Sequence, residues 1–275
     1  MRHRPVWNTV PGVPSMSVVV YTNQKGGVGK STLSVLWAHH AVDKQGETVC
    51  FVDLDSQANS SKNLRQYDCG ISSMELFKPG RIAVAADGPE RLVLFPGSKA
   101  LADLERANPA EILPAFVDQM RGLSKIFDHC VIDTPPALGL RMSAALMAAD
   151  FACCPIELEE YSIDGVTDML KTILGVRQKY NPKLKMLGIV ANRFNAHSPR
   201  QKAALEELLA NYSEFVVPAK MSTRSAIPEA LAAGVPVWRL AKSSAREASA
   251  EVLSLFALLR KKMAGADAGT AVEAA

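Results

Sequence analysis

Short runs of apolar, often β-branched residues alternate with longer amphipathic stretches along most of the 275-residue chain. A buried parallel strand is a continuous apolar run, whereas a surface helix repeats its apolar positions every three to four residues. The apolar runs predict strands at 17–23, 48–55, 91–97, 128–136, 151–158, 185–192 and 214–217. The stretches between them predict helices at 30–44, 72–77, 99–107, 109–123, 140–148, 162–179, 199–210, 225–233 and 243–263.

This alternation predicts a single α/β domain over residues 17–263, built on a mostly parallel, twisted sheet with helices on both faces. Residues 1–16 contain Pro5, Pro11 and Pro14 and are expected to form a flexible arm. Residues 264–275, which are rich in Ala and Gly, are expected to form a disordered tail. Ligands of such sheets bind at the carboxyl ends of the strands, so candidate chemistry is expected there.

The composition excludes several classes of protein. With 48% hydrophobic and 21% charged residues, the chain can bury a large core. No apolar run approaches the roughly 18 residues of a membrane span, and the N-terminus lacks the apolar segment of a signal peptide. The five cysteines show no zinc-site spacing, which favours reduced, buried thiols. These features predict a cytoplasmic protein.

Residues 24–31, QKGGVGKS, follow the first predicted strand and precede the first predicted helix. They match the phosphate-binding loop G-x-x-x-x-G-K-[ST] at every position except the first, where Gln24 replaces glycine. The glycines allow backbone N–H groups to surround phosphates at a helix N-terminus. Lys30 is expected to contact the β- and γ-phosphates, and Ser31 to bind Mg²⁺. The loop therefore predicts a P-loop NTPase fold with a bound nucleoside triphosphate.

Three carboxylates end two other predicted strands. Asp133 ends an apolar run, as in a Walker B strand, and is expected to hold Mg²⁺ through a water. Asp53 and Asp55 end the second strand and are two residues apart, so both side chains can face the same phosphate region. Three carboxylates beside a phosphate-binding loop favour a metal-dependent nucleotide site over a structural role.

The loop and these strand ends resemble the ParA/MinD group of P-loop ATPases. KGGVGKS (25–31) has the deviant Walker A signature of that group, DLDSQAN (53–59) resembles its switch I segment, and VIDTPP (131–136) resembles its switch II segment. IELEEYSIDG (156–165) and IPEALAAGVPVW (227–238) resemble ParA partition proteins, particularly the plasmid IncC type. The resemblance covers residues 17–262.

Two positions depart from the family pattern. Ser56 and Ala58 stand where the family often has Pro and Gly. The switch I segment is therefore expected to move differently in this chain.

The resemblance implies roles for individual residues. Lys25 is implied to reach across a dimer interface to the partner's phosphates, and Asp55 to position the attacking water. Asp53 is implied to support the Mg²⁺ shell or the P-loop, Asn192 to bind the adenine edge, and Pro218 to pack on the ring. The implied catalytic set is Lys25, Lys30 and Asp55, the ATP-binding set is Gly26, Gly27, Val28, Gly29, Lys30, Ser31, Thr32, Asn192 and Pro218, and the Mg²⁺ set is Ser31, Asp53 and Asp133.

Three functions stay open for such an ATPase. The first is DNA partition, in which an ATP-bound dimer binds DNA without sequence preference and partner-stimulated hydrolysis releases it. The others are a MinD-like membrane-positioning ATPase and a small-molecule ATPase or ligase on the same fold. Residues 171–262 hold 16 Lys and Arg against 6 Asp and Glu, which favours DNA. The candidate DNA contacts are Lys220, Arg224, Lys242 and Arg246.

The partition hypothesis implies three partners and a location. The partners are a second copy of the chain, nonspecific double-stranded DNA, and a ParB-type centromere-binding protein, and the location is the nucleoid in the cytoplasm. The acidic run at Glu157, Glu159 and Glu160 is either a docking point for a basic segment of that protein or an ordinary exposed strand end. No membrane partner is expected, because the last predicted helix is interpreted as packed in the core.

Overall fold

The computed structural model describes residues 16–84, 91–160 and 163–273. Its described strands are β1 (Ser17–Tyr21), β2 (Val49–Asp53), β3 (Leu92–Phe95), β4 (His129–Asp133), β5 (Phe151–Glu157), β6 (Lys185–Phe194) and β7 (Val216–Ser222). They form one sheet in the order β3-β2-β4-β1-β5-β6-β7, and every pairing in it is parallel. The predicted α/β class with a parallel sheet is confirmed.

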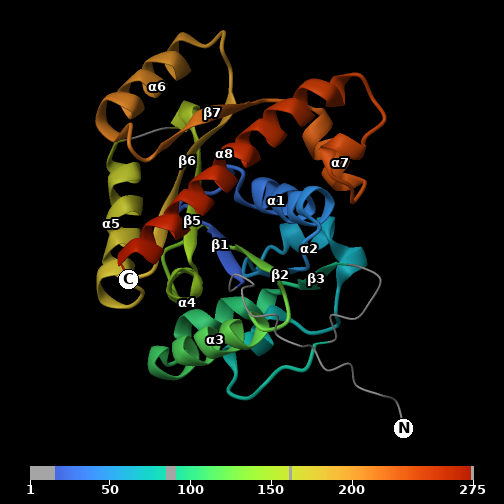
Figure 1. The fold of residues 1–275 in the computed structure, drawn as a ribbon, viewed down its shortest axis with the longest axis vertical. Coiled ribbons are helices and arrows are strands. Elements are labelled where there is room, and N and C mark those ends of the chain that lie inside the picture. Colours follow the sequence, from blue (N-terminus) through green and yellow to red (C-terminus); the bar gives the residue numbers. More distant parts are fainter. Residues whose placement is uncertain (1–15, 85–90, 161–162, 274–275) are drawn as a thin grey trace.

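Helices connect successive strands (Figure 1). The α-helices of the described residues are α1 (Lys30–Gln45), α2 (Asn59–Asn63), α3 (Pro109–Leu123), α4 (Leu140–Ala148), α5 (Ile163–Lys179), α6 (Pro199–Tyr212), α7 (Ala226–Ala232) and α8 (Ser244–Glu273). Short 3₁₀ segments are η1 (Arg65–Tyr67), η2 (Ser73–Phe77), η3 (Lys99–Arg106), η4 (Leu158–Glu160) and η5 (Val237–Arg239).

The sheet separates two hydrophobic cores. Along β1, Val18 and Val20 face one core while Val19 and Tyr21 face the other, as the two-residue period of a strand requires. The first core is completed by α3, α4, α5 and Leu208 of α6, and the second by α1, α7 and α8. In Figure 1, α1, α7 and α8 accordingly lie together, apart from α3. Both faces of the sheet are covered, as predicted.

Several predicted boundaries differ from the structure. The arm was predicted to end at Met16, but Met16 is 5% exposed and belongs to the first core, while residues 1–15 lie outside the described residues. The last helix was predicted to end at 263, but α8 continues to Glu273. Residues 99–106 form a 3₁₀ segment, and the short helix α2 was not predicted. Strand β7 extends past the predicted 217, so Pro218 lies within the strand and not after it.

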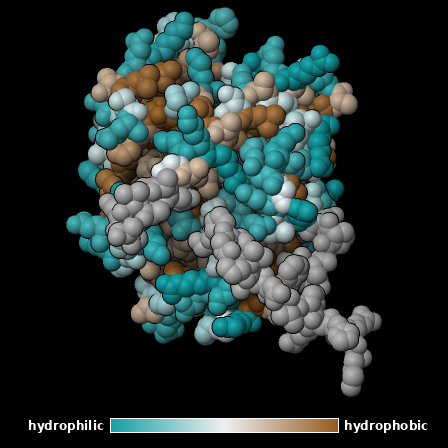
Figure 2. All heavy atoms as spheres, viewed as in Figure 1, coloured by the Kyte–Doolittle hydropathy of each residue, from teal (hydrophilic) through white to brown (hydrophobic). Residues whose placement is uncertain are grey.

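The face in Figure 2 is mostly hydrophilic, with hydrophobic side chains gathered in smaller areas of it. None of the helices in the described part of the chain has the length and apolarity that a membrane crossing requires.

Candidate nucleotide-binding site

The phosphate-binding loop joins the carboxyl end of β1 to the N-terminus of α1. Gly27 and Gly29 have φ angles of 79° and 95°, in the left-handed region that residues with a Cβ avoid. A Cβ on Gly29 would also lie 2.0 Å from the amide nitrogen of Asn192, so this position has no room for a side chain. Gly29 is the N-cap of α1 and offers no side-chain cap, which leaves the first N–H groups of the helix available to an anion.

Lys30 is the first residue of α1, and its ammonium group is held inside the loop. The side chain is buried, and Nζ donates a hydrogen bond to the carbonyl oxygen of Lys25 at 2.7 Å. Burial lowers the pKa of Lys30, while the carboxylates of Asp133 and Asp55 oppose that shift. Lys30 is thus a partly desolvated cation placed among carboxylates, which is the arrangement expected of a phosphate ligand.

Asp133 ends β4 in the centre of the sheet and is fully buried. Burial and the nearby Asp53 raise its pKa to about 7, against the effect of the neighbouring Ser31 and Ser60 hydroxyls and the Lys30 ammonium. Its Oδ2 accepts from Ser60 at 2.6 Å, whereas its Oδ1 is buried without a hydrogen-bond partner among the described residues. An unpaired carboxylate oxygen close to the Ser31 hydroxyl fits Mg²⁺, which prefers oxygen ligands and retains several waters.

Asp53 binds the chain that follows it. Its Oδ1 accepts the Asp55 N–H at 3.0 Å, and its Oδ2 accepts the N–H and hydroxyl of Ser61 at 2.9 and 2.6 Å. Burial raises its pKa to about 6, although these hydrogen bonds act in the other direction. The observed contacts fasten α2 to the end of β2, and a role in the Mg²⁺ shell stays a prediction.

Asp55 is buried and lines a cleft of about 280 Å³ beside the loop. Its Oδ1 accepts the Gln57 N–H at 2.9 Å. The cleft is lined by Gly26, Gly27, Gly29, Lys30, Ser31, Thr32, Asp55, Asn59, Asn63, Pro136 and Arg193. Most of the predicted phosphate-binding residues and Asp55 therefore come together in one cavity.

Four of these lining residues were not predicted. Asn59 and Pro136 lie within the DLDSQAN and VIDTPP segments, so the motifs themselves contained the signal. Asn63 and Arg193 lie outside those two segments, and no sequence motif indicated that they line the cleft. Arg193 has a φ of 53°, and its guanidinium lies 3.6 Å from a carboxylate oxygen of Glu157.

The side chain of Lys25 belongs to a different cavity from Lys30. Lys25 is exposed and lines a cavity of about 230 Å³ that also includes Glu157 of β5 and Asp168 of α5. Its backbone N–H donates to the Asn23 side chain at 2.9 Å, and Asn23 in turn donates to the Pro155 carbonyl at 2.8 Å. The two lysines are thus aimed at different places although they share one loop.

Asn192 and Pro218 lie on the neighbouring strands β6 and β7 and differ in burial. Asn192 is buried, and its amide nitrogen donates to the Val28 carbonyl at 2.9 Å, so β6 supports the back of the loop. Pro218 is exposed on β7 at the edge of the sheet, where a missing N–H interrupts no inner ladder. Contact of either residue with adenine stays a prediction.

The switch I segment has an unfavourable backbone angle at one of its two departures from the family pattern. Ala58 has a φ of 53° and is the N-cap of α2. This conformation costs an alanine roughly 1 kcal/mol relative to the right-handed one. The glycine often found there in the family would adopt it without strain.

The predicted DNA contacts gather around β7, α7 and α8, and two of the four are paired with carboxylates. Arg224 donates to Glu247 at 2.5 Å and to Glu251 at 2.7 Å, and Lys242 pairs with Glu229. The ammonium of Lys220 lies 4.2 Å from the ring centroid of Phe194, and Arg246 is exposed. Carboxylates therefore offset the positive charge of Arg224 and Lys242, which makes Lys220 and Arg246 the stronger candidates for phosphate contacts.

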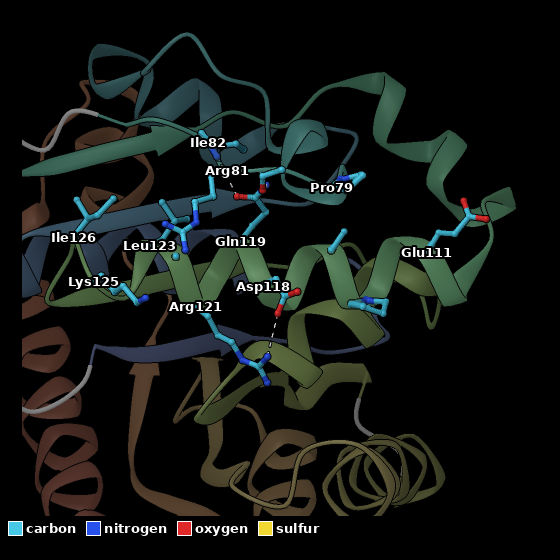
Figure 3. A pocket seen from close by; sticks show the side chains of 14 residues that line it. Pro79, Arg81, Ile82, Glu111, Asp118, Gln119, Arg121, Leu123, Lys125 and Ile126 are labelled. Carbon is cyan, nitrogen blue, oxygen red and sulfur yellow. Dashed lines mark hydrogen bonds and ion pairs between the residues drawn. The ribbon is translucent and has the colours of Figure 1, made fainter.

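A larger cavity of the described residues lies elsewhere. It has a volume of about 860 Å³ and runs along α3, where Figure 3 shows Gln119 pointing towards Ile82 and Arg121 paired with Asp118. None of its lining residues comes from the carboxyl end of a strand. Ligands of parallel sheets bind at those ends, so the smaller cleft at the loop is the candidate active site.

Known proteins resemble this chain over most of its length. A model of the AAA domain matches residues 16–186. Protein IncC of Escherichia coli is 41% identical over 265 residues, which is 92% of this chain and 71% of that protein. Chromosome partitioning protein ParA of Myxococcus xanthus is 28% identical and covers 80% of each chain.

A solved structure extends the likeness to a nucleotide-bound protein. Cobyrinic acid a,c-diamide synthase of Mycobacterium smegmatis, with bound ATP analogue and magnesium, is 27% identical with a TM-score of 0.68, over 89% of this chain and 94% of that one. The resemblance inferred from the loop and the switch segments is confirmed. The chain belongs to the ParA family of partition ATPases.

Proposed function

We propose that this protein hydrolyses ATP to partition DNA, with the ATP-bound dimer holding nonspecific DNA and a ParB-type partner triggering hydrolysis and release. The observation that carries the proposal is the cleft in which Lys30, Ser31 and Asp55 meet beside the buried Asp133. A phosphate-binding loop indicates nucleotide binding but not the process that it serves. The similarity to IncC and ParA supports DNA partition as that process. The location would be the nucleoid.

Each residue of the cleft has a defined task in this proposal. The loop N–H groups and Lys30 hold the phosphates. Ser31 and Asp133 would hold Mg²⁺, which would supply positive charge beside the phosphate oxygens. Asp55 accepts a hydrogen bond from the attacking water and orients it in line. Lys25, which does not line the cleft of its own subunit, binds the phosphates of the partner subunit and offsets the repulsion between two nucleotide-bearing faces.

Replacing Asp55 by alanine is expected to slow ATP hydrolysis by roughly a hundredfold or more while MgATP still binds. The protein should then accumulate as an ATP-bound dimer, measured by gel filtration with ATP and Mg²⁺. Adding Lys25→Ala should prevent that dimer without preventing binding. Asp103→Ala, which removes an exposed carboxylate from η3, is the matched control. Undiminished turnover in Asp55→Ala would assign the water to another residue.

Retention on random-sequence duplex DNA is expected only with ATP, and it should weaken steeply with salt. The double variant Lys220→Gln, Arg246→Gln should weaken binding and reduce the salt slope by about one for each phosphate that is no longer neutralised. Arg121→Gln, Lys125→Gln removes the same charge from exposed positions at the end of α3 and should bind normally. Arg224 is a poor target, because its replacement would leave Glu251 and Glu247 unpaired.

The same assay separates the proposal from its alternatives. No retention in any nucleotide state would contradict a role in DNA partition and direct attention to vesicle binding and small-molecule substrates. The 27% identity with the diamide synthase is the observation that keeps the small-molecule alternative in view. Equal retention with ATP, ADP and no nucleotide would contradict the ATP-dependent dimer.

A further inference from the structure

Arg141 is a buried cation directly behind the switch II segment. It is the second residue of α4, and its side chain is 7% exposed. Burying a guanidinium is unfavourable unless its N–H groups are hydrogen bonded, so each of its contacts requires an explanation. Arg141 lines none of the cavities beside the loop, and the motifs did not point to it.

The partners of Arg141 come from two separate segments. Nε donates to Oε1 of Glu105 in η3 at 2.8 Å, and Nη1 donates to the carbonyl oxygen of Leu54 at 3.0 Å. The other oxygen of Glu105 accepts the Leu140 N–H at 2.7 Å, at the start of α4. Although partial burial acts the other way, these hydrogen bonds lower the pKa of Glu105. Glu105 is thus an ionised anchor that fixes both Arg141 and the helix that carries it.

The carbonyl that Arg141 holds belongs to the peptide that leads into Asp55. The N–H of the same residue, Leu54, donates to the Asp133 carbonyl at 2.9 Å. Leu54 is therefore tied to the end of β4 on one side and to α4 on the other. A Cβ on Gly97 would lie 2.7 Å from the Asp55 carbonyl oxygen, so the chain beyond β3 packs closely against the next peptide, that of Asp55 and Ser56.

We propose that Arg141 is a positioning residue for ATP hydrolysis, acting with Glu105 as a clamp that fixes the Leu54–Asp55 peptide. The clamp joins the switch II segment, through α4, to the switch I segment, through Leu54. It holds the Asp55 carboxylate at the angle from which it orients the water, and it touches neither nucleotide nor metal. The inference rests on the proposed ATPase activity and on the role of Asp55.

The expected effect lies in turnover and not in binding. An error of about 1 Å in the placement of a catalytic group can cost about a hundredfold in rate. Arg141→Leu is expected to lower kcat at least tenfold while the Kd of a fluorescent ATP analogue with Mg²⁺ changes less than threefold. In Arg141→Lys, the single ammonium group can bind either Glu105 or the Leu54 carbonyl but not both in the same geometry. This variant should therefore recover part of the kcat that Arg141→Leu loses.

Three comparisons make the test decisive. Arg121→Leu removes an exposed arginine, 74% exposed, from α3 and should leave kcat unchanged. Arg141→Leu, Glu105→Gln removes both charges, and the amide oxygen can still accept the Leu140 N–H, so its melting temperature should recover relative to Arg141→Leu while its kcat stays low. If the double variant regains kcat together with stability, or if Arg141→Leu turns over within twofold of the natural protein, the clamp has no positioning role. If the natural protein does not hydrolyse ATP, the proposed function fails instead.

Discussion

Replacing Lys30 by alanine is expected to lower the affinity for MgATP by about a hundredfold or more. Hydrogen bonds to charged groups contribute about 1.5–3 kcal/mol each, and every 1.4 kcal/mol is a tenfold change in affinity. The Lys30 ammonium is already buried in the loop and held by the Lys25 carbonyl at 2.7 Å. Binding therefore requires little ordering of this side chain, and its replacement removes the charged hydrogen bonds that its ammonium group would make to the phosphates.

Titration of a fluorescent ATP analogue measures this effect directly. Lys44→Ala, in the last turn of the same helix, removes an equal charge from an exposed position and should bind as the natural protein does. The effect should also be larger for ATP than for ADP, because Lys30 is assigned to the β- and γ-phosphates. An unchanged Kd in Lys30→Ala would mean that the triphosphate does not occupy this cleft.

The parts of the fold that sequence predicted well are those fixed by local signals. Helix α3 begins and ends where predicted, because Pro109 occupies its first turn and the Asn108 side chain accepts the Ala110 N–H at 3.1 Å. The loop was recognisable for the same reason, since its glycines and Lys30 are adjacent in the chain. The strands were visible as continuous apolar runs, because both faces of the sheet are covered.

The parts that sequence did not predict depend on contacts between distant segments. Helix α2 is a single short turn that Ser61 secures to Asp53 and that starts from a left-handed alanine. No local propensity indicates such a helix. Arg224 was assigned to DNA from the positive charge of its segment and from the family resemblance, but its two carboxylate partners lie more than 20 residues further on, in α8. Arg141 was missed because Leu54 lies 87 positions away in the sequence.

Acid is expected to destabilise the protein through three buried histidines, His39 and His40 of α1 and His129 of β4. Burial lowers the pKa of His39 and of His40 to about 4, and the pKa of His129 well below its usual value. For His40, the cations Arg260 and Lys44 add to the shift, and Asp43 opposes it. Since these folded-state values lie below the unfolded value of about 6.5, the stabilisation is complete above pH 6.5 and is lost as the pH falls towards 4.

The contacts of His129 explain why its neutral form is required. The indole N–H of Trp37 is only a donor, so the Nε2 atom of His129, 2.7 Å away, must accept. The ring therefore carries its proton on Nδ1, which donates to the Ser17 hydroxyl at 2.6 Å. A second proton, on Nε2, would point at the indole N–H of Trp37 and replace their hydrogen bond by a repulsive contact in the core. Protonation of His129 therefore opposes folding.

His40 provides the cleanest test of this acid sensitivity. Its Nδ1 is buried without a partner among the described residues, and its ring lies 5.3 Å from Phe256 and 5.7 Å from Trp37 between centroids. A phenylalanine can retain the ring contacts and cannot take up a proton. His40→Phe should therefore gain stability relative to the natural protein as the pH falls from 6.5 to 4, by at most about 3 kcal/mol, measured by urea unfolding.

The stability of His40→Phe must be compared with that of the natural protein at each pH, because two buried carboxylates change the stability of both proteins in the opposite direction. Asp53 and Asp133 have raised pKa values, of about 6 and about 7, so their contribution to stability is lost as the pH rises through those values and returns as it falls. These carboxylates are present in both proteins and cancel in the difference. His197→Gln, at an exposed histidine, should show no pH-dependent gain. A stability difference for His40→Phe that stays constant with pH would mean that His40 does not change its protonation when the protein unfolds.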